Sequence, residues 1–113
     1  MHEYSLMLAL LERVEEAAAA HHALAVHRVC VQVGDLSGVE PELLDSAFAI
    51  VRGGTICEHA VLDIERVAAR WECATCRRAL DAGERLQCPS CGGPAALAAG
   101  DELLLGRLEL EVP

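Results

Sequence analysis

Four of the six cysteines are paired with the spacing of metal ligands. Cys73 and Cys76 form one Cys-x-x-Cys turn. Cys88 and Cys91 form a second, with 11 residues between the two turns. Each turn directs two thiolates inward, and a short hairpin would bring all four soft donors to one point. Because four thiolates close a tetrahedral shell and leave no position for a substrate water, the pattern predicts a structural Zn(II) site.

The sequence leaves other uses of these cysteines open. The Cys-Pro-Ser-Cys-Gly stretch at 88–92 resembles a rubredoxin knuckle, and four thiolates suit iron as well as zinc. A rubredoxin-like iron electron carrier is therefore one alternative. A zinc-ribbon module that binds nucleic acid or protein is another. A redox dithiol or disulfide is the weaker interpretation, because two such pairs together are typical of a metal site.

The charge of the chain argues against nucleic acid and membrane surfaces as partners. Nine arginines, no lysine and 18 acidic residues give the 113-residue chain a net charge of −9. Proteins that bind nucleic acid or anionic membranes carry a basic patch instead. Five of the arginines lie near the cysteines, where they offset thiolate charge and alternate with acidic residues: Arg66, Arg70, Arg77, Arg78 and Arg85.

The first residues offer a second set of donors, made of nitrogen. Met1 should be retained, because removal of an initiator methionine requires a small second residue and His2 is not small. The Met1 amine, the His2 amide and the His2 imidazole can form fused chelate rings around Ni(II) or Cu(II), and Glu3 can supply a fourth donor. Taken alone, the pattern favours a frayed terminal histidine without a role.

Apolar periodicity predicts the elements that position these groups. Residues 4–22 and 41–52 carry apolar residues at helical spacing, and Pro41 suits a first helical position. Three segments alternate apolar and polar residues as strands do: 24–33, 60–69 and 102–112. We predict an α+β fold in which a three-stranded, mainly antiparallel sheet carries two helices on one face. Aromatic residues make up only 3% of the chain, so we expect an aliphatic core.

The Cys-rich segment interrupts this fold as a zinc-ribbon-like insertion that contains the four paired cysteines. We predict a metal-binding domain at 70–94, inserted into an α/β domain formed by 1–69 and 95–113. The remaining cysteines, Cys30 and Cys57, are expected to be packed thiols. No basic leader or long apolar run opens the chain, so we expect a cytoplasmic protein with reduced cysteines.

No catalytic constellation is evident in the sequence. It contains no Gly-rich phosphate loop, no Ser-His-Asp arrangement and no pair of carboxylates with an apolar pocket to tune them. We therefore expect a protein that is not an enzyme.

Three stretches together resemble one known family. They are Met-His-Glu-Tyr-Ser at 1–5, Gly-Asp-Leu-Ser-Gly-Val-Glu-Pro at 34–41, and the knuckle at 88–92. This combination is similar to the HypA/HybF family of hydrogenase maturation nickel metallochaperones, and the resemblance covers essentially the whole length.

The resemblance implies two metal sites. Ni(II), a transient cargo, would be held by His2, the Met1 amine and nearby amides, with Glu3 in support. Glu40 is a loop carboxylate of the kind that has a nickel role in some relatives. Structural zinc would be held by four thiolates: Cys73, Cys76, Cys88 and Cys91.

The resemblance also implies partners. Members of the family deliver nickel to the large subunit of [NiFe]-hydrogenase and cooperate with a nickel-handling GTPase, and some also serve urease. The predicted function is therefore nickel delivery, for which an accessible chain terminus that releases its donors one at a time is well suited. The sequence leaves the choice between a monomer and a homodimer open.

Overall fold

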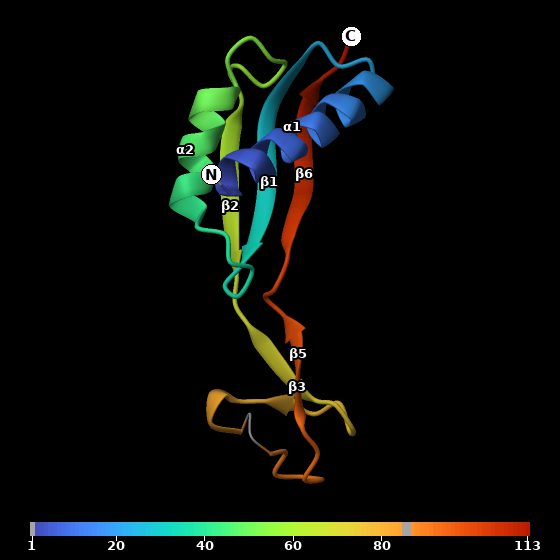
Figure 1. The fold of residues 1–113 in the computed structure, drawn as a ribbon. Coiled ribbons are helices and arrows are strands. Elements are labelled where there is room, and N and C mark those ends of the chain that lie inside the picture. Colours follow the sequence, from blue (N-terminus) through green and yellow to red (C-terminus); the bar gives the residue numbers. More distant parts are fainter. Residues whose placement is uncertain (1, 85–86) are drawn as a thin grey trace.

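The computed structural model describes residues 2–84 and 87–113. The molecule is elongated, with extents of 55 × 30 × 17 Å. A sheet with two helices occupies one end, and the Cys-rich segment occupies the other (Figure 1). Among the described residues, no helix is both long enough and apolar enough to cross a membrane.

Both predicted helices are present. The first, α1, spans His2–Ala20, two residues earlier at each end than predicted, and buries one apolar stripe: Met7, Leu10, Leu11, Val14 and Ala18. The second, α2, spans Pro41–Val51 and begins with proline, whose missing N–H has no intrahelical acceptor to lose. The helices pack against each other.

The main sheet has three strands in the order β2-β1-β6. They are β1 at Ala25–Gly34, β2 at Val61–Val67 and β6 at Leu103–Glu111. The predicted α+β fold, with three strands and two helices on one face, is confirmed (Figure 1).

The pairing of the strands is mixed rather than mainly antiparallel. Strand β1 pairs with β6 antiparallel and with β2 parallel. The connection from β1 to β2 contains α2, and such a helical crossover returns the chain in the same direction. Alternation of residues reports which face a side chain occupies but not strand direction, so the sequence did not reveal this feature.

The core lies between the helices and the central strand. Four valines of β1 are 1–2% exposed: Val26, Val29, Val31 and Val33. They contact the buried stripes of both helices, including Phe48 of α2, which is the only phenylalanine of the chain. The core is otherwise aliphatic, as the composition predicts.

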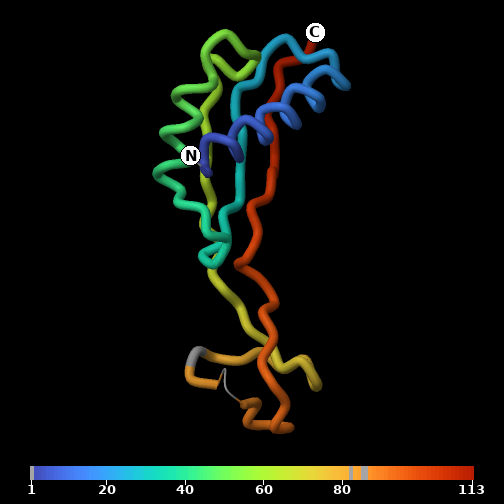
Figure 2. The backbone as a smooth tube through the Cα atoms, viewed as in Figure 1, coloured from blue at the N-terminus to red at the C-terminus, as the bar shows by residue number. Residues whose placement is uncertain are grey.

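A second, smaller sheet carries the cysteines. It contains β3 at Arg70–Cys73, β4 at Ala79–Leu80 and β5 at Ala95–Ala99, in the order β4-β3-β5. A short 3₁₀ turn, η1, follows β4 at Ala82–Glu84. The small sheet is inserted between β2 and β6 in the chain (Figure 2). The predicted boundaries of the metal-binding domain, residues 70 and 94, stay a prediction.

The two sheets meet at a narrow neck of backbone. The N–H of Leu36 donates to the carbonyl of Gly100 at 2.7 Å, and the N–H of Asp35 donates to that of Val67 at 2.9 Å. Gly100 has a φ of +103°, and a Cβ there would overlap the backbone of Ala69. The loop after β1 is thereby held against both chain segments that lead to and from the small sheet.

Candidate metal centre

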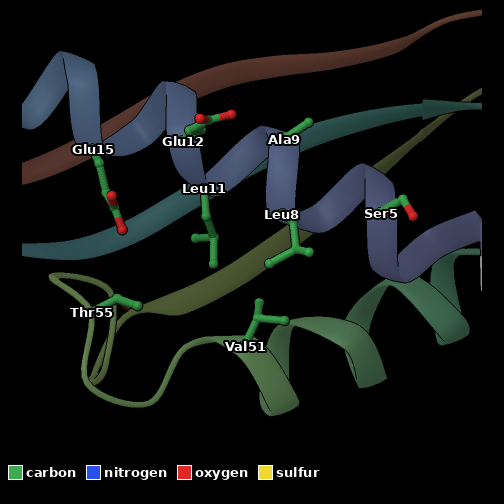
Figure 3. A pocket seen from close by; sticks show the side chains of 8 residues that line it. All are labelled: Ser5, Leu8, Ala9, Leu11, Glu12, Glu15, Val51 and Thr55. Atoms are coloured by element: carbon green, nitrogen blue, oxygen red, sulfur yellow. The ribbon is translucent and has the colours of Figure 1, made fainter.

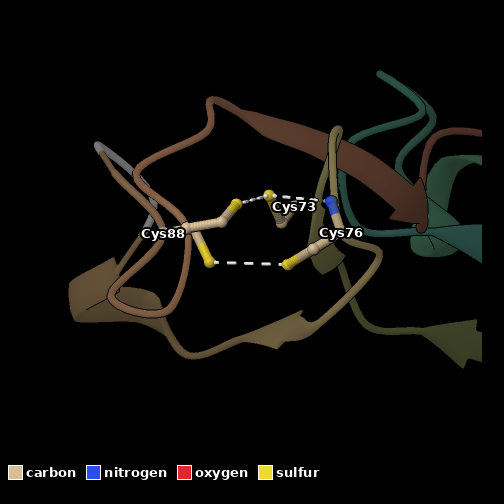
Figure 4. A group of neighbouring side chains, drawn as sticks. Cys73, Cys76 and Cys88 are labelled. Atoms are coloured by element: carbon tan, nitrogen blue, oxygen red, sulfur yellow. Dashed lines mark hydrogen bonds between the residues drawn. The ribbon is translucent and has the colours of Figure 1, made fainter.

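The four predicted zinc ligands come together in the small sheet. The Sγ atoms of Cys73, Cys76, Cys88 and Cys91 all lie within 4.8 Å of one another. The Sγ–Sγ distance is 3.3 Å for Cys73 and Cys91, and 3.8 Å for Cys76 and Cys88 (Figure 4). A tetrahedral zinc ion with Zn–S bonds of about 2.3 Å separates neighbouring sulfurs by about 3.8 Å. The cluster therefore has the size that such an ion requires.

The same backbone turn forms both halves of the cluster. The N–H of Cys73 donates to the carbonyl of Arg78 at 2.8 Å, and the N–H of Arg77 donates back to the carbonyl of Cys73 at 3.0 Å. The N–H of Cys88 donates in the same way to Gly93 at 3.0 Å, and that of Gly92 donates back to Cys88 at 2.8 Å. Two identical turns facing each other place four thiols around one centre.

Each turn needs a left-handed residue at the equivalent position. Arg77 has a φ of +66° and Gly92 a φ of +75°. Glycine adopts this conformation without cost, whereas a non-glycine residue is strained there unless its surroundings hold it. The residue type of Arg77 carries no signal for this conformation, so its place in the knuckle is not evident from the sequence.

Backbone N–H groups set the ionisation of the cluster. The N–H groups of Cys76 and Thr75 each lie 3.4 Å from the Sγ of Cys73. With the Cys76 N–H as the main cause, they lower the pKa of Cys73 to about 6. The N–H of Cys91 likewise lowers the pKa of Cys88. Peptide dipoles thus favour thiolates at this centre.

The pKa of the fourth thiol, that of Cys91, is shifted by the other sulfur atoms of the cluster. The N–H of Gly93 favours ionisation of Cys91, but the neighbouring sulfurs of Cys73 and Cys76 oppose it and raise the pKa of Cys91 to about 12. A divalent cation at the centre relieves this repulsion. The all-sulfur donor set, the spacing and the polarised thiols therefore fit a closed Zn(II) site.

The predicted nickel residues are connected only in part, at the start of α1. The Nδ1 atom of His2 lies 3.8 Å from the Oε2 atom of Glu3. That same Oε2 accepts a hydrogen bond of 3.2 Å from the backbone N–H of Glu40. These two contacts link His2 to Glu3 and Glu3 to the backbone of Glu40, and the Glu40 carboxylate takes part in neither. Met1 lies outside the described residues.

The three residues differ in exposure. The His2 side chain is 63% exposed, whereas Glu3 is buried and its side chain is 12% exposed. Glu40 precedes the first residue of α2, and its own side chain caps no backbone group of that helix. The Glu3 carboxylate satisfies the Glu40 N–H instead, and that N–H is the main cause that lowers the pKa of Glu3. The sequence suggested Glu3 only as a metal donor.

Comparison with known proteins identifies the family. A family described as "Hydrogenase/urease nickel incorporation, metallochaperone, hypA" matches residues 1–110. The chain belongs to the HypA family. The resemblance noted in the sequence is confirmed, and membership indicates a maturation factor rather than a catalyst.

Individual HypA relatives match over their length. "Hydrogenase maturation factor HypA" of Acidithiobacillus ferrooxidans is 38% identical over 113 residues, covering 98% of this chain and 100% of the relative. The protein of the same description from Streptomyces avermitilis is 44% identical over 115 residues, covering 99% of this chain and 83% of the relative.

Solved HypA structures share the fold. The solution structure of the Ni metallochaperone HypA from Helicobacter pylori superposes with a TM-score of 0.76 at 30% identity, covering 98% of each chain. A second HypA solution structure gives a TM-score of 0.82 at 31% identity, covering 100% of this chain and 98% of the other.

The other cysteines lie away from the cluster in this HypA-family chain. Cys57 is fully buried, and burial raises the pKa of its thiol, as expected for a packed residue. Cys30 on β1 is partly exposed. Among the described residues, the four knuckle cysteines are the only group of three or more candidate metal ligands gathered in one place.

Proposed function

We propose that this protein is a nickel metallochaperone, which binds Ni(II) at its N-terminus and delivers it during maturation of [NiFe]-hydrogenase. The observation that carries the proposal is the exposed His2 imidazole held beside the anchored carboxylate of Glu3 at the first turn of α1. Membership of the HypA family supports it.

The first turn of a helix suits the predicted nitrogen donors. The first four N–H groups of an α-helix have no intrahelical acceptor, so the amides of His2 and Glu3 can lose protons without breaking a helical hydrogen bond. The positive end of the helix dipole also stabilises the resulting negative charge. Together with the Met1 amine and the His2 imidazole, these amides complete a planar nitrogen set for the Ni(II) cargo.

The carboxylates have a supporting role in this proposal. Glu3 orients the His2 imidazole, because its own position is fixed by the hydrogen bond from Glu40. The exposed carboxylate of Glu40 supplies a further oxygen donor at the end of the loop that leads into α2. Since His2 is exposed, a partner can remove nickel from the terminal donors one at a time.

The cysteine cluster has a structural role. We propose that Zn(II) binds to Cys73, Cys76, Cys88 and Cys91, where it supplies a cross-link between the two knuckles. The small sheet buries few side chains besides its cysteines, principally Leu80, so such a cross-link would contribute much of its stability.

The partners follow from the family role. We propose a nickel-handling GTPase as the supplier or helper and the [NiFe]-hydrogenase large subunit as the client, with urease as a second client. The reduced thiols of the cluster suit the cytoplasm, where thiols stay reduced. The net charge of −9 supports a protein partner rather than nucleic acid or a membrane.

Titration of the zinc-loaded protein with Ni(II) tests the proposal. We expect one tight site in the wild type, its loss in His2→Ala, and its retention in the matched control His22→Ala, because His22 is exposed but lies beyond the end of α1. Acetylation of the terminal amine should also remove the site. Tight Ni(II) binding that persists in His2→Ala would reject the N-terminal site.

Metal analysis distinguishes the zinc-containing metallochaperone from the rubredoxin-like iron electron carrier. The N–H groups directed at Cys73 also suit an iron–thiolate centre, so geometry favours neither metal. Colourless protein that contains one zinc ion supports the metallochaperone. A red iron–thiolate absorption band would support an electron carrier instead.

A further inference from the structure

An apolar groove runs along the outer side of the two helices and is not used by either metal site. At one end is a hollow of about 230 Å³, formed between the start of α1 and the exposed side of α2: Glu3, Tyr4, Leu43, Ser46, Ala47 and Ile50. Leu43 is 49% exposed and Ile50 is 65% exposed, although both are large aliphatic residues. Leu43 and Ile50 lie seven residues apart on α2, which is about two turns, and with Ala47 between them they share one face of the helix.

A second hollow continues along the same pair of helices. Its apolar part includes Leu8, which is 46% exposed, and Val51. Figure 3 shows Leu8, Leu11 and Val51 pointing toward one another between α1 and α2. From Tyr4 to Glu15, α1 is about 16 Å long, which matches about three turns of a docked helix.

The rim of the groove is acidic. Glu12 and Glu15 line the second hollow, and Glu15 extends toward Thr55 (Figure 3). Within the described parts of the chain, neither of these two carboxylates forms an ion pair.

The cation at the end of α2 is already engaged. Arg52 lies 4.7 Å from the centre of the Phe48 ring. Its guanidinium group also donates to the carbonyls of Glu58 and Ala60. Its donors are therefore used by backbone carbonyls, and among the described residues it forms no ion pair with the rim carboxylates.

We propose that this groove binds an amphipathic helix of a partner protein, with an apolar face on Leu8, Leu43 and Ile50 and basic residues opposite the acidic rim. In helix-in-groove recognition the apolar face of an amphipathic helix lies in an apolar groove, and complementary charges at the border add specificity. The charge decides against a second copy of this chain, because a symmetric contact would bring the same carboxylates together. The first hollow includes Glu3, so a docked helix would lie beside His2; its use in nickel transfer depends on the proposed function.

Synthetic peptides test the groove directly. The probe is a labelled helical peptide with leucines at i, i+4, i+7 and i+11 and with lysines on the remaining positions. Its matched control carries glutamates in place of the lysines. We expect the basic peptide, but not the acidic one, to bind the zinc-loaded protein, with affinity that falls as salt rises.

Substitutions locate the binding surface. Leu43→Ser and Ile50→Ser should each weaken binding about tenfold, because each removes an apolar contact from the groove. Val61→Ser and Leu104→Ser are matched controls, since these residues are 49% and 45% exposed but lie on the main sheet. Glu12→Gln with Glu15→Gln should reduce the salt dependence, whereas Asp101→Asn, near the neck, should leave it unchanged.

Several results would overturn the proposal. Absence of binding, equal loss in the sheet controls, or equal binding of the acidic peptide would each reject a basic helix as the occupant. Concentration-dependent dimerisation that Leu43→Ser abolishes would assign the groove to a second copy instead. Because Ni(II) titration of the same variants is measured separately, loss of peptide binding with nickel binding intact rejects the groove and not the N-terminal site.

Discussion

The two candidate metal sites place their donors in opposite ways. At the N-terminus, His2 is mostly exposed and one anchored carboxylate, Glu3, lies beside it. In the small sheet, Cys73 and Cys88 are 0% and 2% exposed, and each begins a turn with two backbone hydrogen bonds. One donor set is therefore free to move, whereas the other is held by the backbone around it.

This difference in constraint suggests a difference in the lifetime of the bound metal. Release of an ion from the cysteine cluster would require both turns to open, because each of the four thiols belongs to a turn that backbone hydrogen bonds hold. Release of the proposed nickel ion from the N-terminus would require only that the first turn of a helix frays, and helix ends fray readily. A site for cargo and a site for a structural ion would be expected to differ in this way.

The largest effect is expected from breaking the closed site. Cys73→Ser removes the most buried thiol of the cluster, and zinc sites contribute on the order of 10 kcal/mol to the folding of small domains. We expect loss of zinc and of ordered structure in β3, β4 and β5, with the main sheet retained. Zinc content and residue-resolved NMR spectra measure both effects.

Cys30→Ser is the control for this change. Cys30 lies on β1 in the main sheet and is partly exposed, so its replacement should leave zinc content unchanged. A fully zinc-loaded Cys73→Ser protein would contradict the closed four-thiolate site.

A smaller effect is expected from crowding the same site without removing a ligand. A Cβ at Gly93 would lie 2.9 Å from the Sγ of Cys73 and 2.7 Å from the Oγ1 of Thr75. We therefore expect Gly93→Ala to weaken zinc binding in competition with a chelator, while the N-terminal Ni(II) affinity stays the same. Gly83→Ala is the control, because a Cβ at Gly83 meets nothing within 4 Å. Equal zinc affinity in both variants would show that the knuckle adapts freely.

The smallest effect concerns Glu3 at the N-terminal site, whose contribution to the free energy of unfolding depends on pH. The Glu40 N–H lowers the pKa of Glu3 in the folded protein below its ordinary value of 4.5. The ionised carboxylate therefore stabilises the fold above pH 4.5, and this contribution disappears as the pH falls through the lowered pKa. We expect Glu3→Gln to lower the free energy of unfolding at pH 7, and this deficit to shrink at acidic pH.

Urea unfolding at a series of pH values measures this prediction, with zinc content checked at each pH. Glu16→Gln provides the comparison, because Glu16 is an exposed residue of α1. A deficit in Glu3→Gln that stays constant with pH would indicate that the Glu3 carboxylate is not held by the Glu40 amide.

Much of the fold was predictable because its signals are local. Helical and alternating periodicities located both helices and the strands of the main sheet to within about two residues. The knuckles were evident because ligand spacing within each turn is set by three consecutive peptide bonds. The parallel pairing of β1 with β2 was not predictable, since the alternation that marks a strand is the same in either direction.

By itself, the sequence determined which candidate donors are present, namely four thiols in two turns and the imidazole of His2. It also determined that the core is aliphatic. Only the tertiary structure decided which distant groups meet. The bond from the Glu40 amide to Glu3 joins residues 37 positions apart, and the repeated turn required a left-handed Arg77. Neither feature has a local signature, because each arises from how separately encoded elements pack rather than from the preferences of neighbouring residues.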